Sequence, residues 1–267
     1  MSCLIGGVVM WVVGIPLAWF FIRSRRPEYY GLLPDGASVE SGDTTEIVRA
    51  GEKYAAGAGE VEFTAKQAIK TLPFWLLIAA YMFHGALASV MNIHCIPFLT
   101  DRGMNEVVAA ATMSVYILAS IPARFFGGFI ADRVGKSMLR FVLAGSYLLQ
   151  AIGVALFLFN QQSMAVLYIF FILYGIGMGA AMPQAPVIRA RYFGRKAYGT
   201  LQGISTAALT PVGVIGPIAA GWIYDTTGSY VIAFTIFAAT LGLSTVIVAF
   251  AAPPKTSSNS SGITPLR

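Results

Sequence analysis

Charge is scarce in this sequence, because Asp, Glu, Lys and Arg together make up only 11% of its 267 residues. Soluble domains carry about 25% charged residues, which cover a surface that faces water. Hydrophobic residues make up 57% of the chain, and the mean hydropathy is +0.70. The composition therefore argues against a soluble domain and favours a chain whose apolar stretches have a lipid bilayer as their solvent.

Sequence signals of cross-links, metals and catalysis are also lacking. The two cysteines, Cys3 and Cys95, lie in apolar runs and give neither a disulfide framework nor the spacing of a metal site. There is no His/Cys cluster, no phosphate-binding loop, no G-x-S-x-G and no G-x-G-x-x-G. We therefore expect no enzyme, no metal, no cofactor and no pumping driven by ATP. The first apolar run has no positive segment before it, so we expect no secretory signal peptide.

Seven apolar runs are candidates for transmembrane helices, which need roughly 20 residues. They span about 3–22, 72–98, 106–129, 141–160, 164–187, 198–223 and 230–252. The polar stretch 23–71 holds seven Lys/Arg and eight Asp/Glu and is expected to be a solvated linker. Its end, EFTAKQAIKT, is expected to form either a short surface helix or a disordered hinge. The tail 253–267 is expected to be disordered. The predicted fold class is an all-α membrane protein.

Basic residues are distributed unevenly over the segments between these runs. Segments 99–105, 160–163 and 224–229 contain one basic residue, Arg102, so 17 of the 18 Lys and Arg fall on one side of the membrane. Cytoplasmic segments are the basic ones, so we expect the linker and the C-terminus in the cytoplasm and Met1 outside. Topology thereby explains the net charge of +6, and no nucleic-acid binding is expected. An outside N-terminus with an odd number of spans looks like the back part of a longer protein.

An internal repeat relates two of the spans. GFIADRVG begins at Gly128 and GWIYDTTG begins at Gly221, and both fit the pattern G-x-x-x-D-x-x-G at an offset of 93 residues. This offset covers three spans, so the two copies are expected at opposite faces of the membrane. The copy predicted to be cytoplasmic carries Arg133 and Lys136, where the other copy has uncharged residues. The pattern predicts an inverted three-plus-three repeat.

The stretch GFIADRVGK resembles the loop motif of the major facilitator superfamily, in which Gly, Asp, Arg, Gly and a basic residue follow at set spacings. Ser137 stands where the family usually has a further basic residue. The resemblance implies that 72–252 form the six-helix C-terminal half of such a fold. It also implies that 1–22 correspond to the last helix of the N-terminal half and 23–71 to the central cytoplasmic linker. RPEYYGLLPDG and RYFGRKAYGTLQGI most resemble the oxalate/formate antiporters and monocarboxylate transporters. The residues that match the motif are Gly128, Asp132, Arg133, Gly135 and Lys136.

Two interpretations of this motif remain open. Glycines permit a close approach of two helix ends, and Asp132 would be favoured near a facing helix N-terminus. The family resemblance implies that the five matching residues form a conformational latch, which breaks and reforms during alternating access. The alternative is a loop whose basic residues only keep it in the cytoplasm.

Arg124 is the leading candidate for substrate binding, because ionisable side chains inside spans are costly and often functional. It lies eight residues before Asp132, about 12 Å along a helix. In the monocarboxylate transporter group an arginine at the matching place is implicated in carboxylate binding, so the resemblance implies this role for Arg124. The alternative is snorkelling to the interface. Apart from Glu106 at a boundary, no Asp or Glu lies inside a span, so no carboxylate proton relay is expected.

Other polar residues within the spans are weaker candidates. His84 lies about 12 residues into its span and is predicted either to carry a proton or bind an anion, or to be a buried neutral contact between helices. The remaining predicted substrate-binding residues are Asn92, Gln184 and Gln202. The alternative for each is a hydrogen bond that holds two helices together.

Two spans are rich in glycine and proline. Gly175, Gly177 and Gly179 predict close packing of the fifth span. Prolines inside a span kink or break the helix. The sixth span is therefore predicted to be a gating helix, although packing explains the same residues without a function. Its residues of this kind are Pro211, Gly213, Gly216 and Pro217.

Together these expectations predict a secondary transporter of the major facilitator type, with alternating access. The best substrate class is a monocarboxylate or other small organic anion, moved by proton symport or anion exchange. The alternatives are a drug-like solute, or a truncated half that is only a membrane assembly module. Such a half would need a missing N-terminal half or a second copy. A seven-helix receptor fits the number of spans but not the inverted repeat. The predicted location is the bacterial inner cell membrane, with multiple spans.

Overall fold

A computed structural model of the chain describes residues 7–8, 10–21, 63–159, 163–194 and 197–254. The chain forms two compact units, Met1–Glu60 and Val61–Arg267. In the first unit, a π-helical segment, η1 (Met10–Gly14), leads into α2 (Ile15–Phe21). Their apolar side chains are exposed, with Trp11 at 74% and Trp19 at 83%. The first predicted span, 3–22, lies only partly within the described residues, as does the predicted linker 23–71.

The second unit contains a one-turn helix and six long ones. The short helix α4 (Ala65–Ala68) forms because the Thr64 hydroxyl and the Gln67 side chain cap each other's backbone N–H groups. By length and composition, six helices in the described part of the chain can cross a membrane. They are α5 (Leu72–Thr100), α6 (Glu106–Arg133), α7 (Leu139–Phe159), α8 (Met164–Phe193), α9 (Tyr198–Thr227) and α10 (Tyr230–Phe250).

Helix ends extend past the predicted apolar runs. The helix α6 continues four residues beyond 129 and therefore includes Asp132 and Arg133, which were predicted to lie in a loop. The segment 188–197, between the predicted spans 164–187 and 198–223, is helical up to Phe193, and Gly194 then ends α8 with a φ of 81°. The prediction placed the ends where hydropathy falls. A helix instead continues through charged residues until a residue such as a left-handed glycine stops it.

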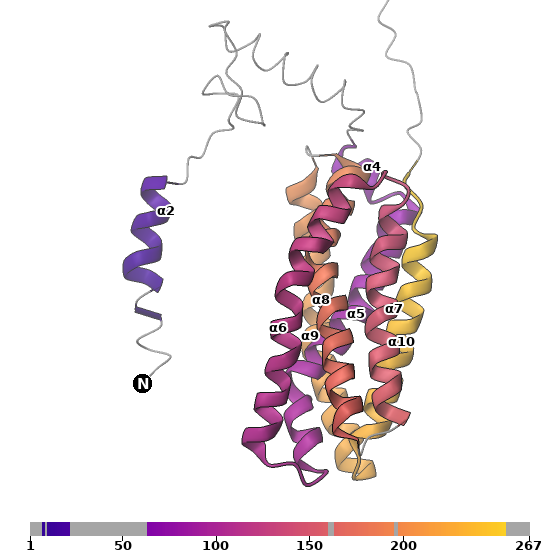
Figure 1. The fold of residues 1–267 in the computed structure, drawn as a ribbon. Coiled ribbons are helices and arrows are strands. Elements are labelled where there is room, and N and C mark those ends of the chain that lie inside the picture. Colours follow the sequence, from indigo (N-terminus) through magenta and orange to yellow (C-terminus); the bar gives the residue numbers. More distant parts are fainter. Residues whose placement is uncertain (1–6, 9, 22–62, 160–162, 195–196, 255–267) are drawn as a thin grey trace, which may run out of the picture. The chain divides into compact units, whose positions relative to one another are not determined.

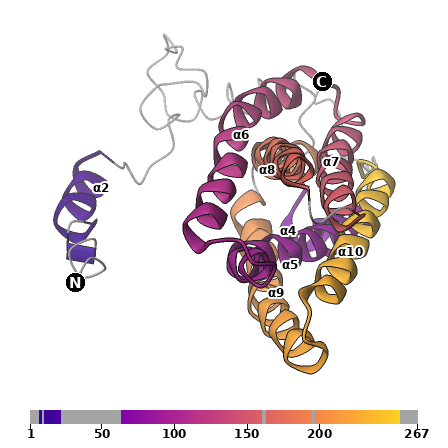
Figure 2. The ribbon, with the colours of Figure 1, turned by 60° about the horizontal axis from the view of Figure 1, so that its bottom comes forward.

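Helix contacts in the second unit follow a two-fold pattern (Figures 1 and 2). The helix α8 packs against α6 and α7, α5 packs against α9 and α10, and α7 packs against α10. Exchanging α5 with α8, α6 with α9 and α7 with α10 turns this set of contacts into itself. The structure thereby confirms the all-α membrane fold with two repeats of three helices.

The two copies of the repeated motif lie at opposite ends of this unit. The first copy ends α6 beside the C-terminal end of α8. That end of α8 meets the start of α5, because the rings of Phe193 and Phe74 are 5.8 Å apart. The second copy ends α9 near the other end of α5, where the ring of His94 lies 5.3 Å from that of Tyr230. The repeat is therefore inverted, as predicted from the offset of 93 residues.

Glycines on α8 allow the closest helix contacts. A Cβ at Gly179 would collide with the backbone of Ser120 on α6, and one at Gly177 would lie 2.5 Å from the carbonyl oxygen of Ser146 on α7. On α6 the close approach is made by Gly127, where a Cβ would lie 2.6 Å from Cα of Ala180. The close approach predicted for the glycines of this stretch is thus made at Gly127, whereas a Cβ at the motif glycine Gly128 would only touch Pro183 at 3.8 Å.

The helices α6 and α9 are the least covered. In their most apolar stretches 22% of the residues are buried, against 33–50% in the other four long helices. Their exposed side chains are large and apolar, such as Phe125 at 76% and Trp222 at 67%. Because α6 and α9 are equivalent in the two repeats, the open faces are themselves related by the two-fold pattern.

Candidate functional site

Arg124 lies on the open helix α6 with its side chain exposed. It is close enough to Tyr116, two turns earlier, for an electrostatic interaction with the phenol group. The ring of Tyr116 in turn meets that of Tyr174 on α8, 5.6 Å away and edge-on. Among the described residues, no carboxylate forms an ion pair with Arg124. The guanidinium therefore keeps its planar set of donors available for an anion.

His84 belongs to a buried polar contact between α5 and α7. Its Nε2 atom lies 3.2 Å from Oε1 of Gln150, and its ring stacks on that of Tyr147 at 4.4 Å. The amide nitrogen of Gln150 donates to the carbonyl oxygen of Ser146 at 3.2 Å. These bonds hold the imidazole between two helices, and a substrate-binding role for His84 stays a prediction.

Asn92 and Gln202 are exposed and bond only within their own helices. The amide nitrogen of Asn92 donates to the carbonyl oxygen of Ala88 at 2.8 Å. That of Gln202 lies 3.3 Å from the Thr206 hydroxyl, so it can donate there. Thr210 follows at the same spacing, so three polar side chains form an exposed stripe along α9. A polar stripe on an exposed helix face suits a water-filled cavity better than lipid.

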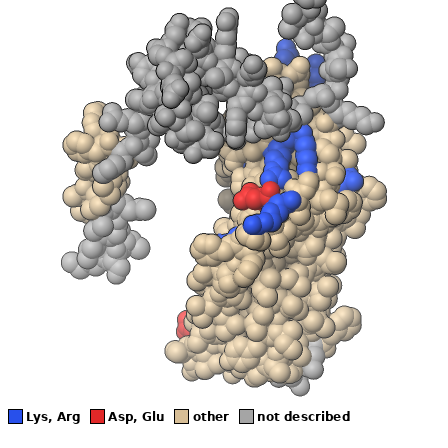
Figure 3. Space-filling model, turned by 45° about the horizontal axis from the view of Figure 1, so that its top comes forward, with Lys and Arg blue, Asp and Glu red and all other residues tan. Residues whose placement is uncertain are grey.

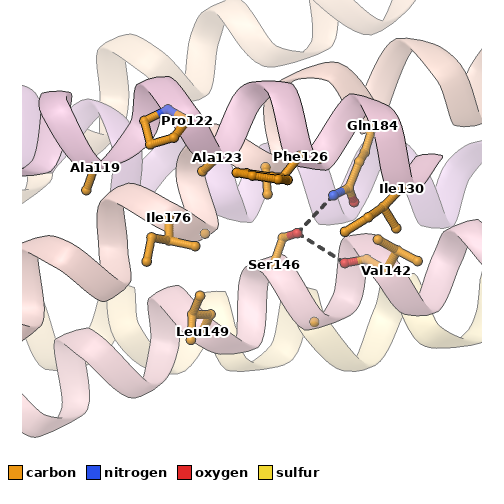
Figure 4. A pocket seen from close by; sticks show the side chains of 14 residues that line it. Ala119, Pro122, Ala123, Phe126, Ile130, Val142, Ser146, Leu149, Ile176 and Gln184 are labelled. Carbon is orange, nitrogen blue, oxygen red and sulfur yellow. Dashed lines mark hydrogen bonds between the residues drawn. The ribbon is translucent and has the colours of Figure 1, made fainter. Parts of the chain in front are cut away.

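Gln184 lies in a crevice of about 460 Å³ between α6, α7 and α8 (Figure 4). Its amide nitrogen donates to the Ser146 hydroxyl at 3.1 Å, and that hydroxyl donates to the carbonyl oxygen of Val142 at 3.1 Å. The amide oxygen of Gln184 is buried and has no hydrogen-bond partner. Gln184 is thus buried, whereas the candidates Arg124, Asn92 and Gln202 are exposed.

The predicted latch centres on a residue that the motif does not contain. Arg191 on α8 donates to the carbonyl oxygens of Val134 at 2.7 Å and Asp132 at 3.0 Å. Its guanidinium lies 4.0 Å from the Asp132 carboxylate. In the sequence, Arg191 is one of several basic residues between the predicted spans 164–187 and 198–223. Only its place in a helix beside the motif shows that it joins the ends of α6 and α8.

The other charged motif residues make different contacts. The guanidinium of Arg133 lies 3.3 Å from the ring centroid of Phe129. Partial burial lowers the pKa of the Lys136 ammonium. Figure 3 shows basic side chains gathered around an acidic patch at this end of the second unit. The described basic residues of this end are Lys66, Lys70, Arg133, Lys136, Arg140, Arg189 and Arg191.

Arg189 is a second arginine that the sequence analysis did not single out. It is 6% exposed, and its guanidinium lies 5.6 Å from the ring centroid of Tyr81 on α5. The Tyr81 hydroxyl donates to the carbonyl oxygen of Ala185 at 3.4 Å. Arg189 lies beyond the predicted span 164–187, and the longer α8 of the structure places it between helices.

The predicted gating helix α9 is hydrogen-bonded to α5 near Pro217, where the proline removes a backbone donor. Pro217 has no N–H, so the carbonyl oxygen of Gly213 lacks its helical donor. The Ser89 hydroxyl donates to that oxygen at 2.7 Å. One turn on, Nε2 of His94 lies 3.0 Å from the carbonyl oxygen of Pro217 and therefore carries the proton. A gating role for α9 stays a prediction, as does that of Pro211 and Gly216.

Metal and cofactor sites are not evident in the part of the chain that the structure describes. No group of three or more His, Cys, Asp or Glu side chains lies close enough there to hold a metal ion. The arginine side chains of this unit can recognise an anion through charged hydrogen bonds.

The chain resembles known transporters along its whole length. The family model described as Major Facilitator Superfamily matches residues 2–161 and 96–266. Monocarboxylate transporter 12 of Rattus norvegicus is 26% identical over 181 residues, which cover 67% of this chain and 37% of that protein. The multidrug resistance protein B homolog of Mycobacterium tuberculosis (strain H37Rv) is 31% identical over 154 residues, which cover 57% of this chain and 27% of that protein.

The fold is also found among solved structures. A crystal structure of the POT family transporter PepTSo has a TM-score of 0.56, with 18% identity over 69% of this chain and 39% of that one. The matched region thus covers well under two thirds of each of these proteins. Six membrane-length helices, the inverted repeat and the match to the family model agree, and the chain is a multi-pass membrane protein that belongs to the Major Facilitator Superfamily.

Proposed function

We propose that this chain provides the C-terminal half of a secondary transporter for a small organic anion, such as a monocarboxylate. The observation that carries the proposal is Arg124, an exposed guanidinium on an apolar helix, with no carboxylate partner among the described residues. An arginine in contact with lipid at this depth would be costly. It is therefore placed in a water-filled path, where it binds the carboxylate through two parallel hydrogen bonds.

The remaining wall of this path is supplied by the exposed polar residues. Asn92 on α5 and the stripe Gln202–Thr206–Thr210 on α9 provide uncharged donors and acceptors for the rest of the solute. Without a carboxylate relay in the described helices, coupling to protons or to a counter-anion is carried by the anion itself or by another part of the transporter. Proton symport and anion exchange are both consistent with this site.

The open faces of α6 and α9 are where the rest of the transporter binds. Their exposed side chains are large and apolar, and nothing in the described unit covers them. A missing N-terminal half or a second copy of the chain would cover them and complete the path. The basic end lies in the cytoplasm of the cell membrane, together with the linker and the C-terminus.

Uptake and binding measured on one preparation test this proposal. Radiolabelled formate, lactate and oxalate are offered to the purified chain in liposomes, with and without a proton gradient, and to the chain in detergent for binding. We expect saturable binding of at least one anion, and Arg124→Gln should weaken it about 10- to 100-fold, since hydrogen bonds to charged groups contribute about 1.5–3 kcal/mol.

Arg102→Gln is the matched control, because Arg102 lies at the opposite end of the unit against the ring of Phe98. It should bind like the unmodified chain. Uptake in addition to binding would show that the chain transports by itself, as an assembled pair. Folded protein that binds none of the anions, or that binds them equally well after Arg124→Gln, would contradict the proposal.

A drug-like solute is the second candidate. The relative from Mycobacterium tuberculosis is named as a multidrug resistance protein, at a higher identity than the monocarboxylate transporter. The same binding assay with a fluorescent lipophilic cation separates the two candidates. Binding of the cation that Arg124→Gln leaves intact or strengthens would favour the drug-like solute, because an arginine repels a cation.

A further inference from the structure

Arg189 carries a positive charge that is buried but not paired. The residue is 6% exposed, and its guanidinium faces the ring of Tyr81 on α5 at 5.6 Å. Among the described residues the one ion pair joins Arg191 to Asp132, so no carboxylate compensates the charge of Arg189 there. A contact with the face of a ring leaves the N–H donors of the guanidinium unused. Because buried charges in proteins are normally paired, Arg189 lacks an anion.

The guanidinium of Arg189 is not sealed off from small solutes. In the described part of the chain, the fully enclosed side-chain polar atoms without a hydrogen-bond partner are Nε of Arg140 and Oε1 of Gln184. The nitrogen atoms of Arg189 form no hydrogen bond with a described residue either, yet they are not among these enclosed atoms. They therefore keep some contact with solvent. Since this contact is small, it suits an anion of a few atoms rather than a bulky one.

The inverted repeat indicates that the fold does not need a charge at this position. The offset of 93 residues that relates the two motif copies also pairs Arg189 on α8 with Ile96 on α5. Ile96 is an apolar residue that packs against the core. The same offset pairs Tyr81 with Tyr174, so the tyrosine occurs in both repeats and the arginine in one. A basic residue that only keeps this end in the cytoplasm can be exposed, as Lys70 is.

Two phenol groups from other helices lie near Arg189. Tyr81 on α5 and Tyr198 on α9 interact electrostatically, and Arg189 is the one cation that acts on Tyr81. The Tyr198 hydroxyl has no hydrogen-bond partner among the described residues. That of Tyr81 reaches the carbonyl oxygen of Ala185 only at 3.4 Å, beyond the 2.5–3.0 Å usual for O–H donors. One positive charge and two weakly engaged donors match a group with one negative charge and several lone pairs, which is a carboxylate.

We propose that Arg189, together with Tyr198 and Tyr81, forms a second binding site for a small monocarboxylate, at the basic end of the unit and separate from Arg124. The guanidinium binds the carboxylate through two parallel hydrogen bonds, and the phenol groups donate to its remaining lone pairs. We expect weaker binding than at Arg124, because the anion loses nearly all of its water in a buried site. The identity of the anion rests on the proposed function, but the site is measured without Arg124.

Formate and lactate binding to the Arg124→Gln chain tests the proposal. Each radiolabelled anion is equilibrated with the purified full chain in lipid nanodiscs. We expect the weaker binding that remains in Arg124→Gln to be saturable and to resist competition by formamide, the uncharged analogue of formate. Adding Arg189→Gln should weaken it a further 10- to 100-fold, about the effect of losing hydrogen bonds to a charged group. Adding Tyr198→Phe should weaken it about fivefold, about the effect of losing one neutral donor.

Lys70→Gln is the matched control, because Lys70 is an exposed basic residue at the same end of the unit. In the Arg124→Gln chain it should leave the binding of both anions unchanged. A general attraction of anions to the basic end would instead be weakened equally by Lys70→Gln and Arg189→Gln. Removing an unpaired buried charge should not unfold the chain, and circular dichroism verifies this. If Arg189→Gln fails to fold, Tyr198→Phe against Lys70→Gln still decides the outcome.

Two results would overturn the second site. One is folded Arg124→Gln chain without saturable binding of either anion, as expected if a carboxylate of the missing half pairs with Arg189. The other is residual binding that Arg189→Gln leaves unchanged. Failure of the proposed function would look different. Arg124→Gln would then bind the anions as tightly as the unmodified chain, and Arg189→Gln alone would abolish the binding.

Discussion

Arg191 holds the end of α6 mainly through backbone carbonyl oxygens. Its two hydrogen bonds to Val134 and Asp132 measure 2.7 and 3.0 Å, whereas the Asp132 carboxylate lies at 4.0 Å and is 75% exposed. Exposed ion pairs contribute little, about 0–1 kcal/mol. The arginine, a residue outside the recognised motif, is therefore the stronger part of the predicted latch in this conformation.

Substitutions at the two residues should have unequal effects. We expect Arg191→Gln to lower the free energy of unfolding by about 1–3 kcal/mol, because charged donors to two carbonyl groups are lost. Asp132→Asn should change it by less than about 0.5 kcal/mol. Unfolding in detergent, titrated with dodecyl sulfate and followed by circular dichroism, measures both. A loss at Asp132→Asn as large as at Arg191→Gln would show that the ion pair holds the helix ends.

At the scale of the element, a proline removes one backbone hydrogen bond of α9, and a side chain of α5 replaces it. Pro217 removes the donor for the carbonyl oxygen of Gly213, and Ser89 on α5 replaces it. The contact is tight there, since a Cβ at Gly216 would lie 3.3 Å from the carbonyl oxygen of Ala86. The carbonyl oxygen of Gly213 therefore depends on a side chain of a neighbouring helix for its hydrogen bond. A gating role of α9 would use this link, and it stays a prediction.

A double-mutant cycle tests this link between α5 and α9. We expect Ser89→Ala to lower the free energy of unfolding by about 1 kcal/mol, because a partly buried carbonyl group loses its donor. In a Pro217→Ala chain the new N–H serves Gly213, so the cost of Ser89→Ala should fall to near zero. Ser114→Ala is the matched control, since that exposed serine bonds only within α6. Equal costs of Ser89→Ala in both backgrounds would refute the link.

The sequence predicted elements better than contacts. The six long helices and the repeat at an offset of 93 residues follow from hydropathy and spacing, which are local properties. The short helix at the end of the linker was one of two predicted alternatives. The partner of Asp132, the role of Gly127 and the burial of Arg189 were missed, because each depends on which face of one helix meets another. The binding roles of Arg124, His84, Asn92, Gln184 and Gln202 stay predictions.

At the scale of the molecule, one repeated arrangement explains both the fold and the distribution of charge. The two motif copies end α6 and α9 at opposite ends of the second unit. Basic side chains gather at the first of these ends (Figure 3), and Arg102 is the described basic residue at the other. If the unit spans the membrane, one copy lies in the cytoplasm and the other lies outside. The proposed path for an anion past Arg124 depends on this topology.

Labelling of two single cysteines from one side of the membrane tests this central claim most directly. In a chain whose own two cysteines are replaced, Ser137→Cys and Thr226→Cys place exposed thiols beside the first and second motif copies. We expect a membrane-impermeant maleimide to label Thr226→Cys in intact cells, and Ser137→Cys only after the membrane is opened. Labelling of both positions from the same side would contradict the inverted, membrane-spanning unit on which the proposed function is built.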